Sequence, residues 1–215
     1  MTKRTMHISI TVLLVVATVT VGYLVFQKWR GNTNVVAGDI TVIPGTRTNT
    51  NVVPVHRVPL ERGEPNRIHI PDRDIQAPVV YVEEANEERF QEALASGVVH
   101  YPGTAAVGEL GNPYIFGHSS DYAWKPGSYK KVFAPLVDIP IGTAVRITND
   151  AGELYIYTVI ETKVVGPKDV SVLDQYNNER YMLTLQTSYP IGTALKRFIA
   201  VCELDSEATF GPATN

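Results

Sequence analysis

The chain has 215 residues with a formal net charge of −3 and a single cysteine, Cys202. This charge gives no basic surface for a nucleic-acid partner, and one cysteine excludes a disulfide within the chain. The length fits one good-sized domain with appendages, and 16 Gly, 14 Pro and 11 Tyr favour strands and turns over a helical bundle.

The N-terminal segment predicts a membrane anchor. Residues 8–26 carry no charge and would span about 28 Å as a helix, close to the thickness of the bilayer's hydrocarbon core. The run is long for a signal peptide and no small-x-small cleavage site precedes Gln27, so an uncleaved anchor is favoured over a cleaved signal. Lys3 and Arg4 favour a cytoplasmic N-terminus. We therefore expect a single-pass protein of the cell membrane whose globular part, following the anchor at 1–30, is extracellular.

Residues 31–66 predict a flexible or extended linker. Asn, Thr, Gly and Pro recur along this segment, and its apolar pairs are too short to build a core. One alternative stays open, in which part of the segment folds over the functional site as a lid.

The main domain is predicted to span residues 67–205 and to be mostly β. The helix expected after Asn86 has acidic residues in its first turn and ends before Gly97. Short strands bounded by turn residues indicate a closed barrel or a sandwich. The expected strands are 67–71, 75–82, 113–116, 143–148, 154–160, 182–187 and 197–201. Residues 206–215 are expected to form a C-terminal tail.

The stretch from 181 to 202 reads as two strands joined by a turn. Ser188 closes the first strand and Arg197 opens the second, so a hydroxyl and a guanidinium are expected at neighbouring strand ends. His118 follows another strand through Gly117, and loop positions of this kind carry chemistry more often than core positions do. The alternative is a structural loop histidine bonded to nearby backbone.

The other histidines are weaker candidates. His100 is the one serious rival to His118 for a catalytic role. The remaining three flank the anchor, lie in the linker or lie inside a strand: His7, His56 and His69.

Four segments together resemble the sortase family, the cysteine transpeptidases of mainly Gram-positive bacterial surfaces. They are Arg67-Ile-His-Ile-Pro with Ala77-Pro-Val-Val, Gly97-Val-Val-His-Tyr-Pro-Gly-Thr104, Gly111-Asn-Pro-Tyr-Ile-Phe-Gly-His118, and Thr184-Leu-Gln-Thr-Ser188 followed by Arg197. The short loops and the sequence Gly-His-Ser-Ser are more similar to the housekeeping or class D/E branches than to the pilin-polymerising class. The resemblance implies an eight-stranded β-barrel with one or two short helices.

The resemblance also implies an activity and roles for residues. Sortases cleave a sorting signal such as Leu-Pro-x-Thr-Gly after its threonine and join the threonine to an amine of a cell-wall precursor or of another protein, such as a pilin-type lysine. By this likeness His118 is the general acid and base, Arg197 stabilises the substrate oxyanion, and position 188 holds the nucleophile, a cysteine in the family. Surface proteins that bear a sorting signal are the implied partners, and their signal would contact Thr187, Pro167 and Leu173.

No cofactor or metal site is predicted. Acidic residues are scattered without an oxygen-ligand loop of EF-hand type, and they read as solvated charges: Glu83, Glu84, Asp138 and Glu161. Calcium dependence stays open.

Ser188 departs from the family pattern and leaves three interpretations. It is an engineered Cys-to-Ser change that inactivates the enzyme, a natural variant that binds peptide without turnover, or the nucleophile of a serine-dependent peptidase. A serine hydroxyl is hardly ionised at pH 7 and needs a well-oriented base. Asp121 is near His118 in the sequence, but the sequence does not show that the two meet. Cys202 has the opposite strand parity to Arg197, so we expect it to be buried and not to replace the nucleophile.

Overall fold

The computed structural model describes residues 59–122, 124 and 126–212. The predicted anchor, most of the predicted linker and the last three residues lie outside these ranges. Within them, none of the helices has the length and apolar character needed to cross a bilayer.

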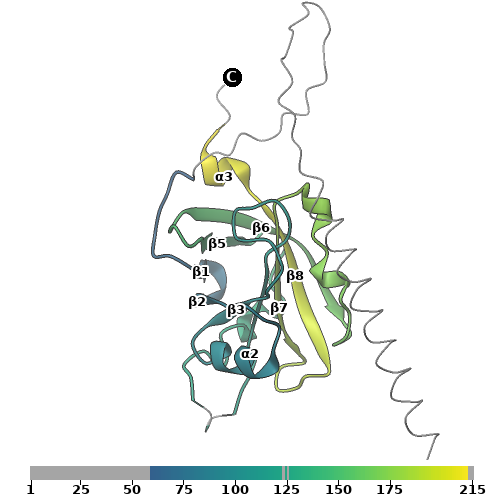
Figure 1. Cartoon of the computed structure of the whole chain (residues 1–215). Helices are drawn as coiled ribbons and strands as arrows, with labels where there is room; N and C mark the ends of the chain where they lie inside the picture. The colour runs from purple at the N-terminus through teal and green to yellow at the C-terminus, as the bar shows by residue number, and fades with distance from the viewer. Residues whose placement is uncertain (1–58, 123, 125, 213–215) are drawn as a thin grey trace, which may run out of the picture. The chain divides into compact units, whose positions relative to one another are not determined.

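Eight strands form a closed barrel (Figure 1), which confirms the predicted mostly β fold. Around the barrel the strand order is β1-β2-β3-β4-β7-β8-β6-β5. The strands are β1 (Arg67–Ile70), β2 (Ile75–Tyr81), β3 (Val98–His100), β4 (Tyr114–Gly117), β5 (Ala144–Thr148), β6 (Leu154–Val165), β7 (Met182–Tyr189) and β8 (Lys196–Leu204).

In the part of the chain that the structure describes, two short α-helices lie at opposite ends of the barrel (Figure 1). They are α2 (Glu87–Leu94) and α3 (Ser206–Phe210), each opened by a side chain that accepts a backbone hydrogen bond, Asn86 for α2 and Asp205 for α3. Four 3₁₀ turns occupy the connections: Pro71–Arg73, Ala134–Leu136, Ser171–Leu173 and Tyr176–Asn178.

The parallel pairing of β4 with β7 decides where functional residues can gather. In this pair Gly117 lies opposite Thr187, and β7 then pairs antiparallel with β8 so that Ser188 lies opposite Arg197. The carboxyl ends of β4 and β7 therefore meet at one edge of the barrel, beside the start of β8.

The central strands are covered on both faces. Inward side chains such as Ile115, Leu185 and Cys202 fill the barrel and are fully buried. A second apolar cluster lies on the outer face of β4, β7 and β8, where Leu173 and other residues of the β6–β7 connection pack against it. The outward side chains nearest the strand ends lie beyond this second cluster and are only partly buried.

The structure corrects several predicted boundaries, among them the ends of β7 at Tyr189 and of β8 at Leu204. Strand β6 runs on to Val165 because a β-bulge between Val159 and Glu161 shifts its register and interrupts the alternation of apolar side chains. Strand β3 was not among the predicted strands. The first residues of the predicted tail form α3.

The described end of the predicted linker lies against the barrel. The amide of Gly63 donates to the carbonyl of Gly152 at 2.8 Å, and the amide of Asn66 donates to the carbonyl of Asn149 at 3.0 Å. Residues 59–66 are thus tied to the β5–β6 hairpin, and they do not line the cleft described below.

Candidate active site

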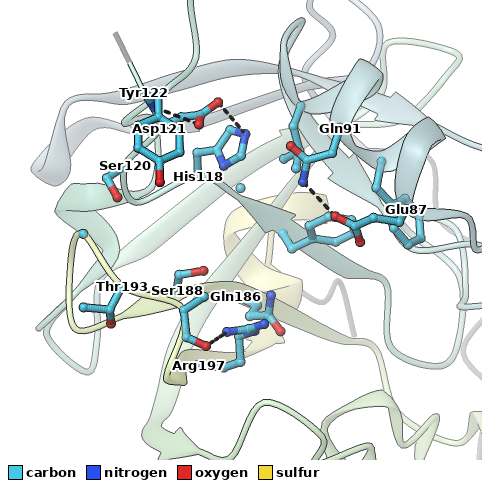
Figure 2. A pocket seen from close by; sticks show the side chains of 16 residues that line it. Glu87, Gln91, His118, Ser120, Asp121, Tyr122, Gln186, Ser188, Thr193 and Arg197 are labelled. Carbon is cyan, nitrogen blue, oxygen red and sulfur yellow. Dashed lines mark hydrogen bonds and ion pairs between the residues drawn. The ribbon is translucent and has the colours of Figure 1, made fainter. Parts of the chain in front are cut away.

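His118, Ser188 and Arg197 line one cleft of about 640 Å³ at the barrel end where α2 packs (Figure 2). Side chains alternate across a strand, so residues 186 and 188 of β7 and residue 197 of β8 share the outer face with Ile199 and Val201. The three candidates come from three adjacent strand ends, those of β4, β7 and β8, of which the sequence predicted the neighbourhood of Ser188 and Arg197.

The end of β4 is fixed from both sides of His118. The buried hydroxyl of Thr187 donates to the carbonyl of Gly117 at 2.9 Å, and the amide of Phe133 donates to the carbonyl of His118 at 2.9 Å. A Cβ on Gly117 would lie 2.8 Å from the Phe133 ring and 2.9 Å from Val98. A glycine is therefore required here, and it lets the chain leave the sheet with His118 facing the cleft.

Asp121 lies beside the candidate base. Its Oδ2 is 3.7 Å from Nε2 of His118, and the two side chains are 11% and 18% exposed. A carboxylate at this distance orients the imidazole and stabilises the imidazolium that forms when the ring takes a proton. The structure thus brings together a pair that the sequence had left undecided.

Arg197 is anchored by backbone carbonyls. Its Nη1 donates to the carbonyl of Ala194 at 3.1 Å and to that of Lys196 at 3.0 Å. These bonds hold the guanidinium against the β7–β8 connection, where it lines the cleft beside Ser188. Fixed, permanently charged donors at this place suit the stabilisation of a carbonyl oxygen that becomes negative.

Two of the predicted peptide contacts line a neighbouring groove. Pro167 and Leu173 belong to a groove of about 240 Å³ that shares Phe90, Phe116 and Gln186 with the cleft lined by His118, Ser188 and Arg197. The two cavities are therefore neighbours at the outer face of β4 and β7.

The predicted contact through Thr187 is wrong. Its side chain has the opposite parity to Ser188, is fully buried and is used to bond Gly117. Thr187 positions the strand ends and does not face the cleft.

Sequence reasoning missed several residues of the cleft. Most lie on α2 or in loops, where no strand periodicity could place them: Glu87, Phe90, Gln91, Leu94, Ser120, Tyr122, Gly192, Thr193 and Ala194. Gln186 was within reach, because it precedes Ser188 by two residues in a strand and so shares its face.

The rival histidine, His100, has a structural role. His100 is buried and stacks on Tyr81 with ring centroids 4.5 Å apart. Its Nε2 lies 2.8 Å from the carbonyl oxygen of Ala105, and burial lowers the pKa of its imidazole. A neutral ring bonded in this way has a packing role.

Cys202 is also removed from the site. It is fully buried among the inward side chains of the barrel, and burial raises the pKa of its thiol. As predicted, it faces away from Arg197 and does not supply a nucleophile.

Comparison with known proteins identifies the family. The model of the sortase domain matches residues 68–205, more than half of the chain. The chain therefore belongs to the sortase family, whose fold is the barrel described above.

Individual relatives match only part of the chain or share low sequence identity with it. Sortase A of Listeria monocytogenes is 38% identical over 74 residues, which are 34% of this chain and 32% of that protein. Sortase A from Corynebacterium diphtheriae has a similar structure, with a TM-score of 0.54, 25% identity, and coverage of 67% of this chain and 61% of that one. A Clostridium perfringens sortase D5 transpeptidase supports the fold, with a TM-score of 0.52, 23% identity and coverage of 67% and 81%. The chain thus matches about a third of its curated relative.

Proposed function

We propose that this chain binds the C-terminal sorting signal of surface proteins and belongs to a system that transfers the cleaved acyl group to an amine. The observation that supports the proposal is the convergence of His118, position 188 and Arg197 in one cleft, which shares lining residues with the groove at Pro167 and Leu173. The signal would lie in the groove and present its carbonyl to the three residues at the strand ends.

The chemistry assigns a role to each of the three. A nucleophile at position 188 attacks the carbonyl, and Arg197 stabilises the oxyanion that forms. His118 gives a proton to the leaving amine and later removes one from the incoming amine. With Ser188 the attack is slow because a serine hydroxyl is hardly ionised near neutral pH. We therefore propose that this form holds the sorting signal with little or no turnover.

The test restores a thiol at the nucleophile position. Ser188→Cys is incubated with a Leu-Pro-x-Thr-Gly peptide and an amine acceptor, with the unchanged chain and Ser188→Ala as controls. We expect cleavage after threonine and a trapped thioester in Ser188→Cys alone. Absence of both products from Ser188→Cys would reject the transferase assignment.

Binding without turnover has its own measurement. The unchanged chain should bind the sorting-signal peptide, and Arg197→Ala should lose most of this affinity because the carbonyl loses its donors. Equal affinity in both forms would contradict the binding role.

The His118–Asp121 pair favours a second candidate, a serine-dependent peptidase. A histidine oriented by a carboxylate is the usual activator of a serine nucleophile. In that case a fluorophosphonate probe labels Ser188, and Asp121→Asn slows the labelling. A chain that remains unlabelled under conditions in which a serine hydrolase reacts would exclude this candidate.

We further propose that the chain is anchored in the cell membrane by residues 8–26 with the barrel outside. Its acceptors would then be amines of the cell-wall precursor or of pilin-type lysines. In cell fractionation the full chain should enter the membrane fraction, a chain lacking residues 1–30 should not, and external protease should cleave the barrel in intact protoplasts. Recovery of the full chain in the soluble fraction would refute the anchor.

A further inference from the structure

Gln186 stands where the catalytic cleft and the neighbouring groove meet. It lines both cavities, and it lies two residues before Ser188 on the same outward face of β7. Figure 2 shows its side chain beside Ser188 and Arg197. A ligand that reached from Ser188 into the groove would pass over this carboxamide.

The surroundings of Gln186 in the groove are mainly aromatic. The rings of Tyr114 and Tyr101 meet edge to face at 6.1 Å, and those of Phe90 and Phe116 meet in the same way at 5.1 Å. All four rings line the groove together with the apolar side chains of the β6–β7 connection. Gln186 is partly buried and open to these cavities. A ligand that covers the groove removes water from the amide, and an amide without water needs a hydrogen-bond partner, because an unpaired polar group costs free energy.

Tyr114 supplies one of these partners and fixes the orientation of the amide. Its hydroxyl donates to Oε1 of Gln186. Burial raises the pKa of Tyr114 above the usual range of a phenol, so the hydroxyl stays neutral beside the amide. With Oε1 bonded to Tyr114, Nε2 points to the other side of the amide, and no residue in the described ranges accepts a hydrogen bond from it.

From this geometry we propose that Gln186 determines substrate specificity, with Tyr114 as its positioning residue. The N–H of Gln186 donates to an oxygen of the bound peptide, and the acceptor lies about two residues before the attacked carbonyl, because strand and extended peptide both advance about 3.3 Å per residue. A ligand with an oxygen acceptor at that place satisfies the amide, and one without it leaves the amide unpaired. The inference rests on the proposed function, in which the sorting signal runs from Ser188 into this groove.

The test measures peptide binding to the full-length Ser188 chain in detergent, so that no chemical step is needed. A fluorescent sorting-signal peptide is titrated by anisotropy against the unchanged chain, Gln186→Leu, Gln186→Glu and Tyr114→Phe. We expect the dissociation constant to rise about 10-fold for Gln186→Leu and Gln186→Glu, the cost of one hydrogen bond with its desolvated partner. Gln76→Leu is the matched control, since Gln76 is an exposed glutamine of β2 outside both cavities, and its affinity should not change.

A double variant separates positioning from bulk packing. If Tyr114 acts through Gln186, Tyr114→Phe weakens binding in the unchanged chain and has no further effect in Gln186→Leu. An equal effect of Tyr114→Phe in both backgrounds would overturn its positioning role.

The source of the acceptor oxygen follows from a second set of peptides. Both series start from the Leu-Pro-x-Thr-Gly peptide, whose proline lies two residues before the attacked carbonyl. One replaces this proline by Ala, Ser or Asn, with the proline peptide as reference, and the other replaces the backbone carbonyl of this residue by a methylene group. Sensitivity to Gln186→Leu that persists with Ala and disappears with the methylene peptide identifies the backbone carbonyl, and sensitivity only with Ser or Asn identifies a side chain.

Failure of this inference can be distinguished from failure of the proposed function. Normal binding by the unchanged chain together with unaltered binding by Gln186→Leu and Gln186→Glu overturns this inference alone. Absence of binding by every form, Ser188→Cys included, overturns the proposed function and this inference with it. Cooperative urea unfolding of each variant shows that it is folded in the assay.

Discussion

Arg197 combines a charge with a fixed direction, since the carbonyls of Ala194 and Lys196 hold its Nη1. A lysine keeps the charge but lacks the planar fork. In a Ser188→Cys background we expect Arg197→Lys to lower kcat/KM by about 10²- to 10³-fold, the usual effect of losing an oxyanion donor. Peptide cleavage assays measure this. Lys196→Ala is the control, because Lys196 is exposed. A loss of kcat/KM of the same size in Lys196→Ala would show that the change disturbs the β7–β8 connection and does not act through the guanidinium.

Asp121 is expected to affect the rate more than the binding of peptide. Its carboxylate lies 3.7 Å from the His118 ring, so Asp121→Asn removes the charge that orients the base. In the Ser188→Cys background kcat should fall between about 10- and 100-fold, the cost of a misplaced catalytic group, while KM changes little. Steady-state kinetics provide the measurement, with Asp72→Asn as a surface control. An unchanged kcat would show that His118 is oriented by other contacts.

At the scale of elements, one hydroxyl joins the two parallel strands that carry the site. Thr187→Val removes the buried donor to the Gly117 carbonyl and leaves that carbonyl without its partner. We expect a loss of roughly 1–3 kcal/mol in the free energy of unfolding, measured by urea denaturation. Thr187→Ser keeps the hydroxyl and should lose less. A larger loss in Thr187→Ser than in Thr187→Val would show that packing of the methyl group, which Thr187→Val keeps, outweighs the hydrogen bond.

The elements also show what the sequence could and could not predict. Alternation along β7 and β8 was enough to place Ser188 with Arg197 and to bury Cys202. The same rule, applied to Thr187, would have prevented the wrong assignment of a substrate contact. The extension of β6 past its bulge, the α2 wall of the cleft and the meeting of His118 with Asp121 depend on tertiary packing and on side-chain rotamers, for which a single sequence holds no periodic signal.

The whole barrel should lose stability in alkali. Burial raises the pKa of Cys202 and Tyr157, and it raises the pKa of Tyr155 to about 12. The unfolded chain releases these protons between about pH 8.5 and 10, so in that range it binds fewer protons than the folded chain and stability falls as pH rises. The urea concentration at the unfolding midpoint should not change because of these groups below about pH 8. It should then fall between about pH 9 and 11.

Variants assign this decline to particular groups. Cys202→Ala removes the group that ionises at the lowest pH, so its midpoint should begin to fall at a higher pH than that of the unchanged chain. A midpoint that stayed constant from pH 8 to 10.5 would contradict the prediction.

The pairing of β4 with β7 has a consequence for the order in which the site is assembled. Ser188, Gln186 and Arg197 belong to one hairpin and are close along the chain, whereas His118 reaches them through a parallel pair that spans 70 residues, from Gly117 to Thr187. Contacts of such long sequence separation carry a large loop-closure entropy and slow folding. The part of the site on the β7–β8 hairpin can therefore form locally, but His118 joins it only when β4 pairs with β7. Partly folded chains would accordingly hold Ser188 and Arg197 together without the histidine that completes the site.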